Sequence, residues 1–421
     1  MSSEQVRPRR GGAGVAVVGA GMVGLSTAWF LQERGIDVEV LERRTPGAGA
    51  SWGNAGWLAP ALTTPLPSPD VLGYGMRAVL DPASPVYVPI SARPALWRFL
   101  TGFARHCTPA RWTRAMTALR PLNERALDAF DELAAGGVDA DTPVADPFLA
   151  CFHGSDGQQA MLAELAELAE LGQKAGFEAL DGAEARRRNP ALTEHVTAAV
   201  QLHDQRFIDP PAFVAALAHA VARRGGRLRL GCEVRSVYDQ VDGVRVETTS
   251  GRRRYDAVVL APGAWMPDLV GRLGVRVPVQ AGRGYSFSVA ADTPLPGPVY
   301  LPDQRVACTP LGGRLRIAGM MEFRGPDDPL DPRRVRAVVE AARPFFTGLR
   351  LDDRRDEWVG SRPCTPDGLP LVGRTLVPRV YAAGGHGMWG IVLGPRTGQL
   401  LAEAVATGRV PDDLRPLDPL R

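Results

Sequence analysis

The first part of the chain alternates short apolar runs with a helical pattern. Residues 15–18 and 38–41 form the two apolar runs, and residues 25–33 between them carry apolar side chains at helical spacing. Short apolar runs on either side of a helix are typical of a β-α-β unit, whose two strands lie parallel. The pattern therefore predicts a strand, a helix and a second strand within residues 13–42.

The middle of the chain has a different composition. Residues 63–94 are rich in proline and glycine, which predicts irregular structure that wraps or gates a site. Apolar spacing then predicts helices over 95–107, 109–135 and 156–172, which we assign to a second domain. A further helix, over 209–224, begins at Asp209-Pro210-Pro211, an N-cap residue followed by prolines.

Short strand-like runs dominate the second half. Strands are expected over residues 227–230, 233–239, 243–249, 256–261, 285–289, 299–301, 305–309, 314–320 and 380–382. The region from 278 to 354 is predicted to form a meander, with a turn at Gly312-Gly313. The strand at 256–261 ends in small residues, so we expect it to rejoin the first sheet. A last helix is predicted over 395–407.

The turn after the first apolar run is rich in glycine. Gly19, Gly21 and Gly24 fit the pattern G-x-G-x-x-G, and Glu42 follows the second run. Gly19 permits a tight turn, Gly21 lets the backbone approach a pyrophosphate, and Gly24 allows close packing of helix on strand. Phosphates bind the free N–H groups at such a helix start, and the Glu42 carboxylate can accept hydrogen bonds from ribose hydroxyls. The sequence therefore predicts a dinucleotide site.

Composition narrows the class of protein. With 421 residues, 45% of them hydrophobic, the chain has material for two or three domains. The formal net charge is +3, and the basic residues, all arginine except Lys174, are spread along the chain, which disfavours nucleic acid as a partner. The five cysteines form no CxxC and the six histidines no HExxH. We therefore expect a reducing, cytoplasmic setting with no disulfide framework and no metal.

The N-terminus carries no targeting pattern. Residues 1–12 are polar and arginine-rich, which predicts a disordered leader and not a secretory signal. The chain also has no run of about 18 apolar residues, so no membrane span is expected.

Five motifs resemble one family in order and in spacing. They are residues 19–24 with Glu42, residues 51–56 (Ser-Trp-Gly-Asn-Ala-Gly), residues 282–285 (Gly-Arg-Gly-Tyr), Arg362-Pro363 with residues 365–368 (Thr-Pro-Asp-Gly), and residues 384–390 ahead of the last helix. Together they resemble the glycine oxidase / D-amino-acid oxidase superfamily of flavoproteins, which includes bacterial D-amino-acid dehydrogenase and sarcosine oxidase. The resemblance covers nearly the whole chain.

The resemblance implies an α/β (α+β) two-domain fold. A discontinuous Rossmann-like FAD-binding domain is expected over 13–62, 205–279 and 362–421. A mixed-sheet substrate domain is expected to be inserted into it over 63–204 and 280–361, after the leader at 1–12.

The cofactor implied is FAD, held without a covalent bond. Small residues at 51–56 let backbone amides reach the isoalloxazine, and the turn at 384–390 places amides and a helix start at its pyrimidine edge, where reduced flavin is negative. Cys364 lies near this region but does not align with the cysteine that sarcosine oxidase relatives use for a thioether. The residues implied to bind FAD are Gly19, Gly21, Met22, Val23, Gly24, Glu42, Arg43, Ser51, Asn54, Ala55, Gly56, Val234, Ala261, Gly263, Trp265, Arg362, Gly387, Met388, Trp389, Gly390 and Ile391.

Three residues are implied to act on the substrate. Arg362 resembles the arginine that anchors the substrate carboxylate by a two-pronged guanidinium contact and aims Cα–H at flavin N5; the alternative is a structural salt bridge. Arg305, if its strand turns it inward, offers a second cation for a second carboxylate, as in an N-carboxymethyl amino acid; the alternative is a solvated surface arginine. Tyr300 either caps the carboxylate with its hydroxyl or packs in the core.

The reaction implied is hydride transfer from Cα to flavin, followed by hydrolysis of the imine by water. No general base is evident, and His386 near the flavin serves either packing or proton handling. We expect an amino-acid oxidase of the glycine oxidase type, converting glycine or an N-substituted glycine to an amine and glyoxylate with O2 as acceptor. The alternatives are a D-amino-acid dehydrogenase that reduces a quinone, an NAD-dependent Rossmann dehydrogenase and a flavoprotein without turnover.

Overall fold

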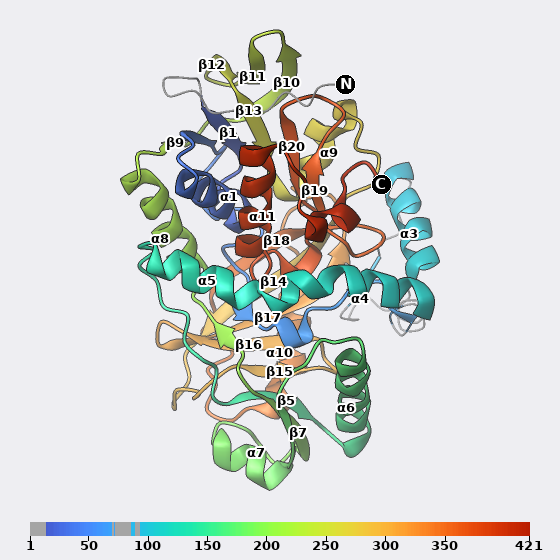
Figure 1. Ribbon diagram of the computed structural model, residues 1–421. Coiled ribbons are helices and arrows are strands. Elements are labelled where there is room, and N and C mark those ends of the chain that lie inside the picture. The colour runs from blue at the N-terminus through green and yellow to red at the C-terminus, as the bar shows by residue number, and fades with distance from the viewer. Residues whose placement is uncertain (1–13, 70, 72–85, 89–92) are drawn as a thin grey trace.

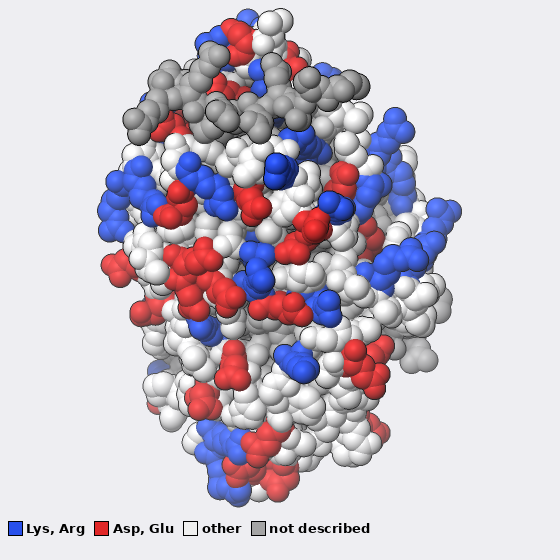
Figure 2. All heavy atoms as spheres, in the orientation of Figure 1, with Lys and Arg blue, Asp and Glu red and all other residues white. Residues whose placement is uncertain are grey.

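The computed structural model describes residues 14–69, 71, 86–88 and 93–421 (Figure 1). The predicted leader and most of the predicted gating stretch at 63–94 lie outside these residues. The chain forms a parallel-sheet half and a mixed-sheet half, which confirms the α/β class expected from the sequence. On the face drawn in Figure 2, acidic and basic side chains are interspersed.

A six-stranded sheet forms the first half. Its order is β19-β20-β13-β1-β2-β9, and all neighbours are parallel except β19 and β20. The strands are β1 (Val15–Val18), β2 (Val38–Leu41), β9 (Arg227–Arg229), β13 (Ala257–Leu260), β19 (Leu371–Arg374) and β20 (Val380–Gly384). They come from three separate stretches of the chain.

Helices cover one face of this sheet. They are α1 (Met22–Glu33), α8 (Pro210–Arg223) and α11 (Gly394–Thr407), with the predicted N-cap Asp209 accepting a hydrogen bond from the Ala212 amide at 3.4 Å. A Cβ built on Gly398 would lie 2.6 Å from the Thr27 amide, so glycine lets α11 pack closely on α1. This burial forms the largest apolar core of the molecule.

The predicted helix over 109–135 is two helices, and its packing differs from the expectation. It divides at Arg125 into α4 (Pro109–Glu124) and α5 (Ala126–Ala135). Leu119 and Phe130 pack in the same core as α1, α8 and α11, and not against the second sheet. Figure 1 shows the pair running across the molecule beneath α1 and α11.

A three-stranded antiparallel sheet covers the other face of the six-stranded sheet. It consists of β10 (Val234–Gln240), β11 (Gly243–Thr248) and β12 (Gly251–Tyr255). Val237, Val244 and Val246 pack there against Ala16 and Val258. Sequence reasoning missed β12, because Arg252, Arg253 and Arg254 break the apolar alternation.

A nine-stranded mixed sheet forms the second half. Its main path is β18-β14-β17-β16-β15-β5-β7-β6, and β4 (Val86–Tyr87) pairs with β17. The strands are β18 (Arg355–Cys364), β14 (Gln280–Val289), β17 (Arg314–Phe323), β16 (Val306–Leu311), β15 (Val299–Leu301), β5 (Phe148–Phe152), β7 (Ala198–Leu202) and β6 (Phe177–Asp181). The predicted meander is correct for β15 to β17, but β14 lies between β17 and β18.

The two faces of this sheet have different neighbours. Helix α10 (Pro332–Ala342) packs Val335 and Val338 onto Tyr285 and Phe287 of one face. The opposite face contacts the 51–57 segment of the first half, as described below. The remaining elements are α3 (Pro94–His106), α6 (Ser155–Glu170), α7 (Gly182–Arg188), α9 (Met266–Val270) and the ribbon of β3 (Trp57–Leu58) with β8 (Arg206–Phe207).

In the described part of the chain, no helix is both long and apolar enough to span a membrane. Within the same residues, no three histidine, cysteine or acidic side chains gather as a metal site would require. All five cysteines are buried free thiols.

Candidate functional site

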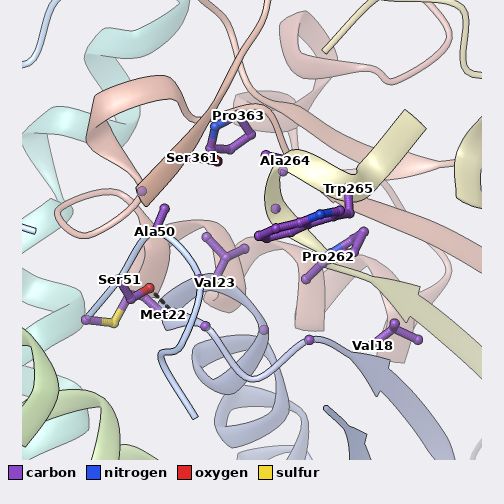
Figure 3. A pocket seen from close by; sticks show the side chains of 18 of the residues that line it. Val18, Met22, Val23, Ala50, Ser51, Pro262, Ala264, Trp265, Ser361 and Pro363 are labelled. Carbon is purple, nitrogen blue, oxygen red and sulfur yellow. Dashed lines mark hydrogen bonds between the residues drawn. The ribbon is translucent and has the colours of Figure 1, made fainter. Parts of the chain in front are cut away.

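A pocket of about 410 Å³ opens at the carboxyl ends of β1, β2, β13 and β20 and is closed on one side by β18. Ligands of open parallel sheets bind at this edge. Figure 3 shows Trp265 with its indole edge directed toward Val23, and Ala50 and Ser51 lying across from it. The pocket is therefore bounded by both halves of the molecule.

Most residues predicted to bind the cofactor line this pocket. They are Gly19, Gly21, Met22, Val23, Gly24, Glu42, Arg43, Ser51, Asn54, Val234, Ala261, Gly263, Trp265, Arg362, Gly387, Met388, Gly390 and Ile391. These residues come from seven short runs of the chain, so the pocket brings together residues that lie far apart in the sequence.

The glycine turn has the geometry that its pattern predicts. Gly19 has φ +102°, and a Cβ on Gly24 would lie 2.0 Å from the Gly19 carbonyl oxygen. A Cβ on Gly21 would meet only the Ser51 hydroxyl, at 3.4 Å. Gly24 thus permits the turn to pack on the helix, whereas Gly21 leaves the pocket side of the turn open.

The carboxylate of Glu42 is fixed by backbone amides. It accepts hydrogen bonds from the Ala20 and Arg44 amides, each at 2.8 Å. Each oxygen keeps a further acceptor position, since an ionised carboxylate offers about four. The side chain therefore stands oriented at the pocket for a hydroxyl donor such as a ribose.

Backbone amides without acceptors line one side of the pocket. Among the described residues, the amides of Gly49 and Ala50, which line the pocket, donate no hydrogen bond. Gly263 and Gly387 have positive φ, and nothing described lies within 4 Å of a Cβ built on either. Such open amides and bare backbone fit the phosphates and the polar ring edge of FAD.

Arg362 reaches the pocket from β18 without an acidic partner. Its Nη1 donates to the Met320 carbonyl at 2.7 Å, and a Cβ on Gly284 would lie 2.1 Å from its Nη2. Met320 has φ 68°, at a register shift between β14 and β17 that turns its carbonyl to the guanidinium. Burial lowers the pKa of Arg362. Glycine at 284 therefore makes the room in which the cation lies.

The alternative of a structural salt bridge at Arg362 finds no support in the described residues. Asp367 pairs with Arg421 at 2.8 Å, and Glu357 pairs with Arg354 at 2.9 Å. None of the described carboxylates lies within ion-pair distance of Arg362. A half-buried cation without a carboxylate partner is costly, so the site is suited to an incoming anion.

Trp265 links the two halves at the edge of the pocket. Its Nε1 donates to Asp327 at 2.8 Å, and the Arg43 guanidinium lies 3.8 Å from the indole centroid. Arg43 also pairs with Asp327 at 3.6 Å. Arg43 and Trp265 both line the pocket, so this contact fixes two predicted cofactor residues through one carboxylate.

His386 is buried beside the last glycine turn. Its Nε2 lies 3.0 Å from the Thr397 hydroxyl, and its Nδ1 has no partner among the described residues. Burial lowers its pKa to about 4. The ring is therefore neutral at physiological pH, which favours packing over the storage of a proton.

Replacing His386 by asparagine is expected to remove a pH dependence of stability. Between pH 6.5 and about 4 the unfolded chain binds a proton at this histidine and the folded chain does not. Stability is therefore complete above pH 6.5 and falls with acidification, by about 2 kcal/mol at pH 5. Urea unfolding at pH 7.5 and pH 5 measures the difference between wild type and variant. An equal loss in both proteins would contradict a buried neutral ring.

Five predicted residues do not line this pocket. Trp389 lines a separate small cavity and donates its Nε1 to the Thr64 carbonyl at 2.7 Å. Ala55 and Gly56 follow the pocket-lining Asn54 but contact other elements. The Ala55 carbonyl accepts a hydrogen bond from Thr309 of β16. A Cβ on Gly56 would lie 2.2 Å from the carbonyl oxygen of Ile208, which follows β8. The other two are Tyr300 and Arg305.

The strand expected to carry Arg305 begins one residue later. β16 starts at Val306, and Arg305 lies in the preceding turn with φ 55° and an exposed side chain. Tyr300 packs edge-on against Trp57, and Arg305 is its hydrogen-bond partner. Of the two alternatives stated for Arg305, the exposed side chain agrees with the solvated arginine and not with an inward cation, because the turn directs it to solvent.

Sequence reasoning missed several lining residues. Ala48, Gly49 and Ala50 precede the predicted 51–56 loop, and Ser361 and Pro363 flank Arg362. The Gly-Ala-Gly-Ala run at 47–50 was a usable signal, since small residues let backbone approach a ligand. Pro262 and Ala264 belong to the segment noted after the strand at 256–261, but they were not assigned to the cofactor.

A model of the family described as FAD dependent oxidoreductase (DAO) matches residues 14–404. Proteins named D-amino acid dehydrogenase are 31% identical over 408 residues in Cereibacter sphaeroides, covering 94% of this chain and 92% of that protein, and 29% identical over 409 residues in Agrobacterium fabrum, covering 93% and 95%.

Solved structures share the fold over nearly the whole chain. Glycine oxidase from Geobacillus kaustophilus has a TM-score of 0.76 at 24% identity, covering 97% of this chain and 98% of that one. Iminodiacetate oxidase from Chelativorans sp. BNC1 has a TM-score of 0.71 at 20% identity, covering 96% and 98%.

Proposed function

The chain belongs to the DAO family of FAD-dependent oxidoreductases, and on this premise we propose that it oxidises the Cα–N bond of a D-amino acid in the manner of a D-amino-acid dehydrogenase. The sequence alone favoured the glycine oxidase type. The whole-length relatives named D-amino acid dehydrogenase move the preference to the alternative stated there.

The residues of the pocket are compatible with FAD. The open amides at Gly49 and Ala50 supply donors, and the carboxylate of Glu42 supplies an oriented acceptor. When bound, FAD accepts the hydride that leaves the substrate Cα. The attachment we propose is non-covalent: Cys364 is 1% exposed and lies outside the main pocket, and burial raises its pKa to about 12, so the thiol stays protonated.

The single observation that carries the proposal is the guanidinium of Arg362. It lies in the pocket with one backbone partner and no carboxylate in the described chain. A substrate carboxylate supplies the missing charge and can take two parallel hydrogen bonds. This contact fixes the orientation of Cα, and fixed geometry alone lowers the barrier by several kcal/mol.

The surroundings of Arg362 favour a small substrate. The Trp358 indole lies over Gly360, two residues before Arg362 on β18; a Cβ there would lie 1.8 Å from the ring. The indole thus fills the position beside the guanidinium on the same strand face. For this reason we keep oxidation of glycine or an N-substituted glycine as a second candidate.

Anaerobic mixing with substrates tests both candidates. The yellow holoenzyme is mixed with D-alanine, D-proline, glycine, sarcosine and N-carboxymethyl amino acids, and L-alanine serves as the control. Bleaching by D-alanine and D-proline, with none by L-alanine, is the expected result. Bleaching by glycine and its N-substituted forms alone favours the second candidate, and bleaching by none of these compounds contradicts both.

Exposure of the reduced enzyme to air then separates the acceptors. We expect slow recovery of colour in air and fast recovery on addition of a soluble quinone. Fast recovery in air would instead identify an oxidase.

A further inference from the structure

The loop at residues 52–57 contacts three strands of the second sheet, β16, β17 and β18. Arg316 of β17 donates Nη1 to the Trp52 carbonyl at 2.8 Å, and the Thr309 hydroxyl of β16 donates to the Ala55 carbonyl at 2.7 Å. The Trp57 Nε1 donates to the same hydroxyl at 2.9 Å. From β18, the Trp358 indole covers Gly53, where a Cβ would lie 2.1 Å from the ring.

Two of these contacts come from one cross-strand pair. Thr309 and Arg316 are direct partners in the β16–β17 ladder, so both side chains leave the same face about 5 Å apart. The face is the one opposite α10, whose contacts are Tyr285 and Phe287. A pair of adjacent side chains therefore binds two carbonyls that lie three residues apart along the loop.

Binding the carbonyls sets the direction of the amides. In a trans peptide the N–H points opposite to the C=O, so the Gly53 amide points away from Arg316. Gly53 is buried, and its amide donates no hydrogen bond to any described residue. Ser51 and Asn54, on either side of it, line the pocket. A buried amide without an acceptor calls for a partner that the protein does not supply.

The guanidinium of Arg316 forms no direct ion pair with a described carboxylate, although Asp209 and Asp356 act on it from a distance. The residue is 8% exposed, and its ion pairs are absent from the described part of the chain. The Trp52 ring lies 5.2 Å from its guanidinium, and burial lowers the pKa of Arg316. Burying a charge without a direct ion pair is costly. Among the described residues the Arg316 side chain makes one hydrogen bond, to the Trp52 carbonyl, and this bond offsets part of that cost.

We propose that Thr309 and Arg316 are positioning residues for FAD: they hold the 52–57 loop by its carbonyls and so present the Gly53 amide to the cofactor. The two side chains act through the loop and need no contact with cofactor or substrate. They thereby contribute to how tightly FAD is held and to its reduction potential.

The test compares two substitutions at Thr309. Thr309→Val keeps the shape of this fully buried side chain but loses both hydrogen bonds, whereas Thr309→Ser keeps the hydroxyl. Thr309→Val is expected to weaken FAD binding by about fivefold to thirtyfold, the loss of one or two hydrogen bonds, and to lower the midpoint potential. Thr309→Ser is expected to restore both values to within about twofold of wild type.

A matched control separates positioning from stability. Thr375 is also buried, and its hydroxyl donates to the Val377 and Val380 carbonyls at the far end of β20. Thr375→Val is expected to lower the melting temperature but to leave FAD affinity and potential unchanged. The proposal is overturned if Thr309→Val keeps wild-type affinity and potential, or if Thr375→Val shifts them equally.

A second pair of variants repeats the test at Arg316. Arg316→Lys retains one donor for the Trp52 carbonyl and Arg316→Met retains none, so FAD release is expected to be fastest from Arg316→Met. Equal release from both would count against a role through the carbonyl. All these measurements are made without substrate, so they remain informative if the substrate proposal fails.

Discussion

Replacing Arg362 by alanine is expected to lower kcat/KM for every amino-acid substrate by roughly 10²- to 10⁴-fold, the cost of leaving a charge buried without its partner. Among the described residues, Nη1 of Arg362 donates to the Met320 carbonyl and weakly to the Met321 sulfur, so the other guanidinium nitrogens are available to a carboxylate. Without this guanidinium the substrate carboxylate is bound more weakly, and the Cα–H bond is no longer oriented. KM is therefore expected to rise and kcat to fall, as stopped-flow reduction over a range of substrate concentrations would reveal.

Two further variants sharpen the result for Arg362. Arg362→Lys keeps the charge but not the two-pronged geometry, so an intermediate loss is expected. Arg350→Ala removes the same charge from an exposed pair with Asp292 and is expected to leave kcat/KM unchanged. A loss below tenfold in Arg362→Ala would mean that another group binds the carboxylate.

Alanine at Gly21 and at Gly24 is expected to damage cofactor binding in two different ways. At Gly24 the new Cβ would lie 2.0 Å from a backbone oxygen of the same turn. The apoprotein should lose about 3 kcal/mol or more, because backbone cannot move aside cheaply. At Gly21 the new Cβ meets only a hydroxyl at 3.4 Å, so the apoprotein should keep its stability within about 0.5 kcal/mol.

The FAD affinities then distinguish the two glycines. For Gly21→Ala we expect binding about 10- to 100-fold weaker, since a methyl group blocks the approach of the pyrophosphate to charge-assisted donors. Denaturant unfolding of the apoprotein and FAD titration by fluorescence quenching measure the two quantities separately. Wild-type FAD affinity in Gly21→Ala would place the pyrophosphate elsewhere.

The nucleotide half was predictable because its signals are local. Residues 15–18 form a strand as expected, and the glycine turn fixes where α1 begins, although Met22 and not Leu25 is its first residue. The first half also relies on patterns that repeat, an apolar run followed by small residues. Such patterns involve residues close together in the chain, so they can be recognised without knowing the tertiary structure.

The second half was less predictable because pairing partners decide its strands. β18 was not expected to be a strand, since its Arg-Asp-Glu start and its Pro363 are poor strand formers; β14 pairs along nearly its whole length and compensates. The start of β16 after Arg305 could not be predicted, because Arg305 has a positive φ and arginine is not a residue type that favours one. The inward cation on this sheet face is Arg316, one strand further, which only the register reveals.

The site divides in the same way. Glycine patterns and Arg362 located the pocket from sequence, and eighteen of the predicted cofactor residues line it. The hydrogen bond of Trp265 to Asp327 and those of Thr309 and Arg316 to the 52–57 loop could not be predicted from the sequence. They join residues that lie far apart in the chain and share no sequence pattern. Whether each lining residue contacts FAD stays a prediction.

The scattered origin of the pocket has a consequence for biosynthesis. Gly21 and Gly387 line the same cavity, and the nearby contact of Trp389 with Thr64 joins residues 325 positions apart. At roughly 5–20 residues per second, a ribosome needs about 20–70 s to make the chain from Gly21 to Gly387. Throughout that interval the nucleotide turn exists without its opposite wall. A chain that has not yet reached Gly387 therefore lacks part of the surface that we propose for FAD.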